Sequence, residues 1–293
     1  MENRKKCLVI GSNSFSGSYF TKFLLLKEYS VFAISRSQEL GKVFNPYKNL
    51  ETKENLKFFQ LDINRDIPAI VELIKNNHIE YIVNFAAQSM VAESWKNPDH
   101  WFSTNVVSTI SLHNELRKLD FLKKYVHVST PEVYGNCEGK VDENYYFNPS
   151  TPYAVSRAAA DMSLKTFGES YDFPFVITRA ANVYGACQQL YRIIPRTIFY
   201  ILTKKKLKLH GGGFSKRSFI HINDVCDATH KIMIKGKKHN TYHISTNKLI
   251  SINDLVRLIC EKMQVRFEKS VDIVDERLGK DANYFLDSSK LRM

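Results

Sequence analysis

The sequence has few cysteines and no long apolar run. Its cysteines form no Cys-x-x-Cys pair and no disulfide framework; the five lie at positions 7, 137, 187, 226 and 260. No apolar stretch approaches the roughly 18 residues that a membrane-spanning helix needs. The first residues lead straight into a strand pattern, without a cleavable signal. We therefore expect a protein of the reducing cytoplasm, with no membrane partner and no metal.

Acidic residues are fewer than basic ones: 42 Lys and Arg stand against 30 Asp and Glu, a formal net charge of +12. A charge of this size suits a nucleic-acid partner. However, the lysines are spread along the chain, and no aromatics interleave with the densest run, Thr203-Lys204-Lys205-Lys206, to stack on bases. We expect no nucleic-acid partner; a basic balance also suits a diphosphate ligand.

Repeats and low-complexity tracts are absent, and apolar runs alternate with helical patterns, as in β-α-β units. Predicted strands span 7–11, 30–35, 56–61, 81–86, 125–129 and 175–179, with short ones around Phe219 and Tyr242. Predicted helices span 16–27, 67–76, 101–117, 153–171 and 251–264. The predicted fold class is α/β. A Rossmann, doubly wound parallel sheet with helices on both faces covers residues 1–180. A smaller C-terminal substrate-binding lobe covers 181–293, and some of its segments return to the first domain.

A glycine-marked turn follows the first predicted strand, in the segment Gly11-Ser12-Asn13-Ser14-Phe15-Ser16-Gly17. Gly11 permits the tight turn, and Gly17 lets the next helix pack closely against the strand. Backbone N–H groups and the helix dipole then face a pyrophosphate. The middle position of the glycine spacing holds Ser14, whose small side chain still allows close approach. We assign dinucleotide binding to Gly11, Asn13, Ser14, Phe15 and Gly17.

The end of the second predicted strand helps to choose the cofactor. NAD sites commonly place a carboxylate there for the ribose 2′-hydroxyl, whereas the 2′-phosphate of NADP suits an arginine and hydroxyls. Here the chain reads Ser35-Arg36-Ser37, with no acid before Glu39. We predict NADP, with NAD as the alternative; Arg36 could instead be a solvent-facing loop residue. Further cofactor contacts are expected at Asp62-Ile63, beside the adenine, and at Ala86-Ala87.

Two later segments carry the groups needed to move a hydride and protons around a sugar carbon. Ser129-Thr130-Pro131-Glu132-Val133-Tyr134-Gly135 ends a buried apolar run, and open α/β sheets place their chemistry at strand ends. Tyr153-Ala154-Val155-Ser156-Arg157 adds a phenol and a cation. The alternative is that Thr130 and Glu132 only cap a turn and Tyr153 starts a helix. The nucleotide site upstream favours a catalytic role for Thr130, Glu132, Tyr153 and Arg157.

These motifs occur in a fixed order together with Asn84-Phe85-Ala86-Ala87-Gln88-Ser89, Asn182-Val183-Tyr184-Gly185, 217–225 and 277–281. The chain resembles the extended short-chain dehydrogenase/reductase superfamily over essentially its whole length. Within that superfamily it is most similar to nucleotide-sugar 4,6-dehydratases of the dTDP-glucose and GDP-mannose types.

The resemblance implies a mechanism. Tyr153 takes the proton of the sugar 4-hydroxyl while the C4 hydride passes to the nicotinamide, and Thr130 binds the 4-oxygen. The new ketone acidifies the C5 proton, a carboxylate removes it, and water leaves from C6. The hydride then returns to C6, so the cofactor is regenerated. Glu132 is the nearby carboxylate. An epimerase would not need it, and this residue favours a dehydratase over a 4-epimerase or another oxidoreductase of the family.

Two residues depart from the family pattern. Pro131 stands where the dTDP-glucose enzymes have an acid-donating aspartate, so Glu132 serves as both base and acid, or a water helps. Arg157 stands where the superfamily has a lysine, which binds the nicotinamide ribose and lowers the tyrosine pKa. Arginine keeps the charge but not the compact geometry. A catalytically impaired cofactor-binding protein is therefore a further alternative.

The resemblance also implies the partners. The substrate is a nucleotide-diphosphate sugar, whose phosphates suit arginine forks. Substrate contacts are expected at Gln88, Ser89, Asn182, Arg192, Arg217 and Arg277. Family members often pair through two long helices, here 101–117 and 153–171, so a homodimer or a dimer of dimers is expected.

Overall fold

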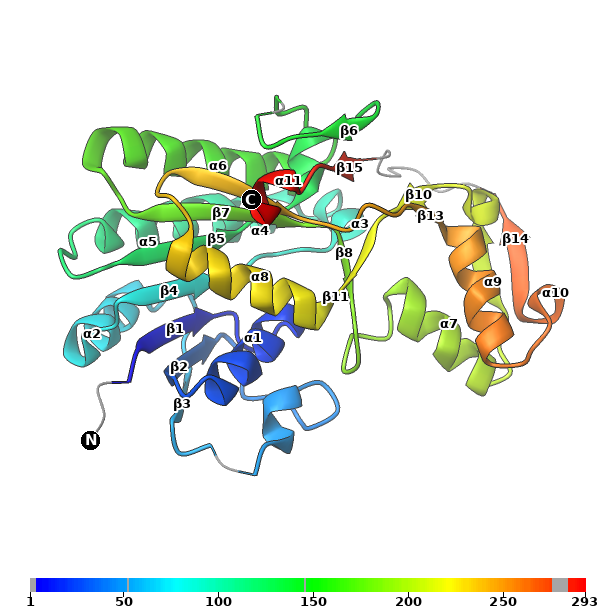
Figure 1. Ribbon diagram of the computed structural model, residues 1–293, viewed down its shortest axis with the longest axis horizontal. Helices are drawn as coiled ribbons and strands as arrows, with labels where there is room; N and C mark the ends of the chain where they lie inside the picture. The colour runs from blue at the N-terminus through cyan, green and yellow to red at the C-terminus, as the bar shows by residue number, and fades with distance from the viewer. Residues whose placement is uncertain (1–3, 52, 145, 276–283) are drawn as a thin grey trace.

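The computed structural model describes residues 4–51, 53–144, 146–275 and 284–293 (Figure 1). Its centre is a seven-stranded sheet with the order β12-β7-β5-β4-β1-β2-β3. The strands are β1 Lys6–Ile10, β2 Ser30–Ser35, β3 Leu56–Gln60, β4 Tyr81–Asn84, β5 Lys124–Val128, β7 Phe175–Ala180 and β12 Asn240–Ile244. Every neighbouring pair is parallel. The strand order reverses at β1, where the chain turns from β3 back to β4, and ligands of such sheets bind at this switch point.

Helices cover both faces of the sheet (Figure 1), which is why every strand except the edge strand β3 is buried along nearly its whole length. The helices are α1 Phe15–Leu26, α2 Ile67–Asn77, α5 Thr109–Leu116, α6 Pro152–Tyr171 and α8 Ile222–Lys235. One buried cluster joins α1 and α8 to the sheet through side chains such as Phe20 and Ile232. The other joins α2, α5 and α6 to it through Ile70, Leu112 and Leu164. The predicted doubly wound Rossmann fold is confirmed.

The helix predicted over 101–117 is a continuous run of three pieces. These are α4 Pro98–Phe102, a π-helix Ser103–Ser108 and α5. It begins earlier than predicted because Pro98 suits the first helical position. In the wider π turn the Thr109 hydroxyl donates to the Thr104 carbonyl over 2.9 Å. Such π segments are frequent at functional sites.

A smaller lobe extends from the carboxyl ends of the strands (Figure 1). It contains α7 Ile193–Leu202, β9 Leu207–His210, η4 Gly211–Gly213, α9 Ile252–Lys262, α10 Phe267–Ser270 and β14 Val271–Val274. Its own core includes Leu209, Val256 and Phe267. Short pairs complete the fold: β6 Lys140–Val141 with β15 Phe285–Leu286, β8 Asn182–Tyr184 with β11 Phe219–His221, and β10 Lys216–Arg217 with β13 Ile250–Ser251.

The C-terminal part of the chain returns to the main sheet. The strand around Tyr242 is β12, which pairs with β7 at the edge of the sheet, and α8 packs on the sheet beside α1. The division at residue 180 stays a prediction. Other short elements are η1 Pro46–Asn49 between β2 and β3, α3 Val91–Ser94, η3 Pro131–Tyr134 and α11 Ser289–Arg292. Among the described residues, no helix is both long and apolar enough to cross a bilayer.

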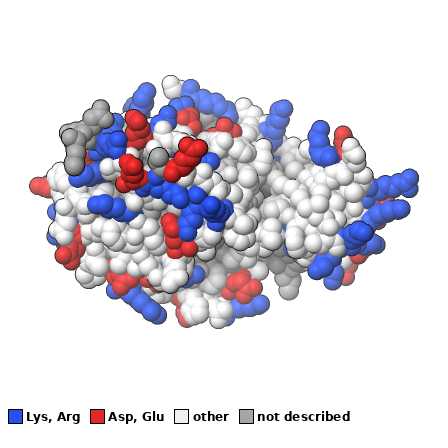
Figure 2. All heavy atoms as spheres, turned by 90° about the horizontal axis from the view of Figure 1, so that it is seen from below, with Lys and Arg blue, Asp and Glu red and all other residues white. Residues whose placement is uncertain are grey.

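The charge distribution differs between the two lobes (Figure 2). Basic and acidic side chains are interspersed over the larger lobe, and basic ones gather at the far end of the smaller lobe. There a hollow of about 350 Å³ is lined by Lys204, Lys205, Arg266 and Lys269 together with Ile201, Val265 and Ser270. The run Lys204-Lys205-Lys206 lies just after α7, which ends at Leu202.

Candidate active site

The turn after β1 has the geometry of a phosphate-binding turn. Gly11 has a φ of +79°, and its N–H donates to the Ile34 carbonyl of β2 over 2.9 Å. A Cβ on Gly11 would lie 2.7 Å from the backbone nitrogen of Ala86, and one on Gly17 would lie 2.3 Å from the Gly11 carbonyl oxygen. Both positions therefore require glycine. Ser14 caps α1 by accepting a hydrogen bond from the Gly17 N–H at 3.0 Å.

Asn13 and Phe15 face structural partners. The Asn13 amide donates to the Ser37 hydroxyl over 3.0 Å and to the Gln38 carbonyl over 2.8 Å, and so ties the turn to the loop after β2. The Phe15 ring is buried in the core between α1 and α8. Only the backbone of Phe15, at the start of α1, remains for a ligand.

The other cofactor candidates lie at the carboxyl ends of β2, β3 and β4. Ser35 is buried and ends β2, and Arg36 after it is exposed. Glu39 is occupied by an ion pair with Lys48, at 2.8 Å. Asp62 accepts the Asn64 N–H at 2.9 Å. The Ile63 side chain lies in the core, whereas Ala86 and Ala87 are partly exposed.

The predicted catalytic residues lie together at the end of β5 and the start of α6. Thr130 caps the 3-10 turn η3, accepting the Glu132 N–H at 3.3 Å, and Pro131 takes the first position of that turn. Thr151 caps α6, accepting the Ala154 N–H at 3.1 Å. Tyr153 at the start of α6 is 8% exposed, and Glu132 is half-buried, with its Oε2 shielded from solvent.

The electrostatics of the Tyr153 phenol show which groups surround it. Burial raises its pKa to about 12, and the Glu132 carboxylate raises it too. The charge of Arg157, a hydrogen bond with the Thr130 side chain and the charge of Arg192 lower it. A phenol within range of both a carboxylate and a guanidinium is suited to proton transfer.

Arg157 lies one turn after Tyr153 and is only 1% exposed. Its Nη2 donates to the Val128 carbonyl and lies 3.1 Å from His127 Nε2, both on β5. Its Nη1 is buried and has no hydrogen-bond partner among the described residues. A guanidinium in this position has a donor to spare for a ligand.

The sequence analysis did not predict a buried polar network that lies below the predicted catalytic residues. Asp161, fully buried on α6, accepts the Ser129 hydroxyl at 2.6 Å and Arg179 Nη2 at 2.8 Å. Arg179 on β7 also donates to the Tyr134 hydroxyl at the end of η3. The signal available in the sequence was the spacing: Tyr153, Arg157 and Asp161 recur every four residues along one helix face.

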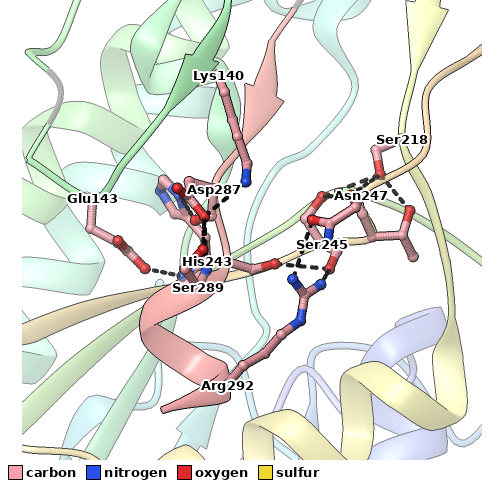
Figure 3. Close-up of polar contacts among 11 residues, drawn as sticks. Lys140, Glu143, Ser218, His243, Ser245, Asn247, Asp287, Ser289 and Arg292 are labelled. Carbon is pink, nitrogen blue, oxygen red and sulfur yellow. Dashed lines mark hydrogen bonds and ion pairs between the residues drawn. The ribbon is translucent and has the colours of Figure 1, made fainter.

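His243 on β12 links this network to the C-terminal segment. Its Nε2 lies 2.7 Å from the Tyr134 hydroxyl, and its Nδ1 lies 3.0 Å from the Asp287 carbonyl oxygen. Its backbone N–H donates to Glu143 over 2.9 Å (Figure 3). Burial, and then the charge of Arg179, lower the pKa of His243 to about 3. The turn that carries Glu132 is thus fastened to β12 and to the chain after β15.

The predicted substrate residues lie on separate segments of the fold. The Gln88 N–H donates to Asn105 Oδ1 over 2.8 Å, and Ser89 is exposed. Asn105 also donates to Ser156 Oγ over 2.9 Å, which joins the π-helix to α6; sequence analysis missed this residue. The other candidates are Asn182 on β8, Arg192 before α7 and Arg217 on β10 over the Tyr284 ring. Arg277 lies outside the described residues.

A cavity of about 910 Å³ lies elsewhere, between α2, α5 and α6. Its lining includes Val71, Asn114 and Phe167 but none of the residues of the predicted motifs. The site is therefore identified by its assembled side chains and not by this cavity.

Comparisons with known proteins agree with this geometry. Residues 8–290 match the family described as GDP-mannose 4,6 dehydratase. A dTDP-D-glucose 4,6-dehydratase of Bos taurus is 34% identical over 299 residues, covering 98% of this chain and 82% of the relative. A dTDP-glucose 4,6-dehydratase of Mycobacterium tuberculosis is 30% identical, covering 98% and 86%.

Solved structures give the same picture. The dTDP-glucose 4,6-dehydratase DesIV from Streptomyces venezuelae, with NAD and TYD bound, superposes with a TM-score of 0.90. It is 28% identical, and the match covers 98% of this chain and 89% of that one. A UDP-glucose 4-epimerase from Thermotoga maritima, with UDP-glucose, has a TM-score of 0.88 at 26% identity, covering 98% and 91%.

The Gly17→Val substitution tests the turn. A side chain there meets the Gly11 carbonyl and Ser14 Oγ, so the turn shifts and loses its backbone donors. Overpacking of this kind costs about 1–3 kcal/mol, so the expected dinucleotide should bind roughly tenfold more weakly or worse. Fluorescence titration measures this, and Gly41→Ala, where a Cβ meets nothing within 4 Å, is the control. Unchanged affinity in the Gly17 variant would place the ligand elsewhere.

Proposed function

Because the chain belongs to the family described as GDP-mannose 4,6 dehydratase, we propose that it is a nucleotide-sugar 4,6-dehydratase. It is an enzyme of the lyase class and yields a nucleotide-linked 4-keto-6-deoxyhexose. The support is the match over residues 8–290 and the relatives at 30–34% identity, which are named dTDP-glucose 4,6-dehydratases. The match covers more than four-fifths of the length of each of these relatives.

One observation carries the proposal: Glu132, in the turn η3 after β5, and Tyr153, at the start of α6, lie in the same small region. The Glu132 charge raises the pKa of the buried phenol, so the two groups lie within electrostatic reach of each other. A 4-epimerase exchanges a hydride at C4 and needs a phenol but no base for C5. A dehydratase needs both groups, on adjacent atoms of one sugar ring.

The site fits a nicotinamide dinucleotide. The bare Gly11 and Gly17 backbone, the capped start of α1 and the spare donor on Arg157 are the features that a pyrophosphate and a ribose need. Gly11, Asn13, Ser14, Phe15 and Gly17 would hold the pyrophosphate side, and Tyr153 and Arg157 the nicotinamide side. When bound, the nicotinamide accepts the hydride of C4 and returns it to C6.

The protein's own side chains move the protons. Tyr153, as the phenolate, takes the proton of the 4-hydroxyl, and Thr130 donates a hydrogen bond to the same oxygen. Glu132 removes the proton of C5, now acidified by the neighbouring ketone. Pro131 has no proton to give, so Glu132 passes this proton to the departing C6 hydroxyl, which leaves as water. When the hydride returns to C6, C5 takes up a solvent proton through Glu132, and Tyr153 releases the proton of the 4-hydroxyl to solvent, so the sugar loses one water in total.

The diphosphate and the sugar would contact residues around this centre. Arg192 is the best supported of them, because its charge reaches the Tyr153 phenol. Asn182 and Arg217 lie on short strands between the two lobes, and Gln88 is held by Asn105. We assign binding of the sugar to Gln88 and Ser89. We assign binding of the diphosphate to Asn182, Arg192, Arg217 and Arg277, which belong to a substrate-binding C-terminal lobe.

The cofactor is NAD or NADP, and we propose a preference for NADP. Arg36 is exposed at the end of β2, where a 2′-phosphate would lie. The nearest acid after it, Glu39, is held by Lys48. The neighbouring structures of DesIV and of the Bacillus anthracis dTDP-glucose 4,6-dehydratase contain NAD, which makes NAD the alternative.

We further propose a homodimer, formed through α4, the π-helix, α5 and α6. Exposed apolar side chains gather on these helices: Phe102 at 37%, Val107 at 63%, Val155 at 39% and Met162 at 57%. Val155 and Met162 are seven residues apart and share one face of α6. Two such faces would bury each other as a four-helix bundle.

A cytoplasmic location is also proposed. All five cysteines are free thiols, four of them buried, which suits a reducing compartment. Cell fractionation tests it; recovery of the protein from a secreted or membrane fraction would overturn it.

Glu132→Gln tests the reaction. The amide cannot take a proton from C5, so loss of water should fall at least a thousandfold, within the range of general-base effects. Dinucleotide affinity should stay unchanged. The assay follows dTDP-glucose, GDP-mannose and UDP-glucose by mass spectrometry, and Glu138→Gln, an exposed residue after the same turn, is the control. Full turnover in the Glu132 variant would contradict the assignment, and wild-type epimer formation without water loss would favour the epimerase.

Arg36→Glu tests the cofactor preference. Loss of a charge-assisted hydrogen bond should weaken NADP binding by about tenfold to a hundredfold and leave NAD unaffected. Isothermal titration measures both affinities. Lys42→Glu makes the same charge change on the exposed loop beyond and is the control. A wild-type preference for NAD would refute the proposal.

Met162→Glu tests the dimer. The new carboxylate on α6 would face the same carboxylate of the partner copy across the four-helix bundle. The two charges repel each other, so the dimer should dissociate at micromolar concentration. Light scattering measures the mass. Leu26→Glu, on the exposed side of α1 at 65% exposure, is the control and should stay dimeric. A wild-type monomer at the same concentration would contradict the proposal.

A further inference from the structure

Two guanidinium groups, Arg157 and Arg179, are buried at this site, and among the described residues only Arg179 is paired with a carboxylate. Arg179 makes the ion pair with Asp161 at 2.8 Å. Arg157 donates through Nη2 to the Val128 carbonyl and lies 3.1 Å from His127 Nε2. A buried cation held only by neutral acceptors depends strongly on their position, because water cannot replace them.

His127 is placed to be such an acceptor. It lies on β5, fully buried. The groups facing it are Arg157 and Asp161 from α6, Arg179 from β7 and His113 from α5. Burial, then the charges of Arg157 and Arg179, hold the pKa of His127 well below its usual range, so the imidazole is neutral.

The neutral ring has one acceptor nitrogen, and the contacts identify it. Nε2 lies 3.1 Å from Arg157 Nη2 and 3.4 Å from Asp161 Oδ1. A proton on Nε2 would put two donors together at the shorter distance, so Nε2 carries the lone pair and Nδ1 carries the proton. We therefore take His127 Nε2 as an acceptor for Arg157; in this tautomer the buried Nδ1–H has no hydrogen-bond partner among the described residues.

We propose that His127 is a positioning residue for the reaction: with the Val128 carbonyl, its imidazole holds the Arg157 guanidinium beside the Tyr153 phenol. This inference rests on the proposed dehydratase function for its catalytic consequence. The structural consequence, a fixed guanidinium, is independent of it. The strand end therefore contributes to catalysis twice, through Thr130 after β5 and through His127 within it.

The catalytic consequence has a definite sign. A cation near the phenol favours the phenolate, and Arg157 lowers the pKa of Tyr153. The other groups facing the phenol are Glu132 and Thr130 from η3 and Arg192 from the segment before α7. If the guanidinium moves away, these remain and the pKa rises. In the pH profile of kcat, the limb that rises as the Tyr153 phenol loses its proton must then move to higher pH.

The experiment compares His127→Leu with His127→Gln. Leucine removes the acceptor. The limb should move up by about one pH unit, and kcat on its rising part should fall about tenfold while KM stays within about threefold. Glutamine offers a carbonyl oxygen at the same reach and should restore the wild-type profile. His113→Leu removes a buried imidazole that accepts nothing from Arg157 and should leave the limb in place.

A second measurement distinguishes failure of the proposed function from failure of the inference about His127. Arg157 held by two acceptors should give slowly exchanging guanidinium resonances in proton–nitrogen spectra, assigned by Arg157→Met. These should persist in His127→Gln and vanish in His127→Leu, with thermal unfolding reporting that each variant is folded. A wild type that removes no water from any nucleotide sugar defeats the proposed function, and these spectra then decide the role of His127. Resonances or a pH limb unchanged in folded His127→Leu overturn the inference.

Discussion

The end of the sheet that carries the predicted catalytic residues depends on the buried carboxylate of Asp161. It accepts from Ser129 after β5 and from Arg179 on β7, while its own helix carries Tyr153 and Arg157. Two strands and one helix are thereby fixed relative to one another. Burying charges is costly unless each finds partners, so this arrangement persists only in one geometry. Through Arg179 and the Tyr134 hydroxyl the same constraint reaches the turn that holds Glu132.

The parallel sheet explains why residues distant in the chain meet. The carboxyl ends of β1, β4 and β5 lie side by side, which brings Gly11, Ala86 and Thr130 to one edge. The smaller lobe stands over that edge, and His243 ties the catalytic turn to β12 and to Asp287 (Figure 3). The turn after β1, the turn that carries Glu132 and the smaller lobe are thus parts of one packed unit.

The sequence predicted most of the sheet because each buried strand is an apolar run between turn residues; residues 30–35 agree at both ends. It did not predict that the 101–117 helix contains a π segment, because local patterns carry no signal for one extra residue per turn. Thr130, Glu132, Tyr153 and Arg157 come from local motifs. Asp161, Arg179, His127 and Asn105 do not, because their partners lie in other strands and helices. The hydrogen bonds of the Asn13 side chain were not predicted either, because the loop after β2 that accepts them is brought close to Asn13 only by the fold.

The most direct measurement of the central claim follows a deuterium atom placed at C4 of the nucleotide sugar. If Tyr153 and Glu132 act on neighbouring carbons of one ring, the product is lighter by one water and carries the deuterium at C6. A product of unchanged composition with the deuterium still at C4 would contradict the account, because Glu132 would then have removed no proton from C5.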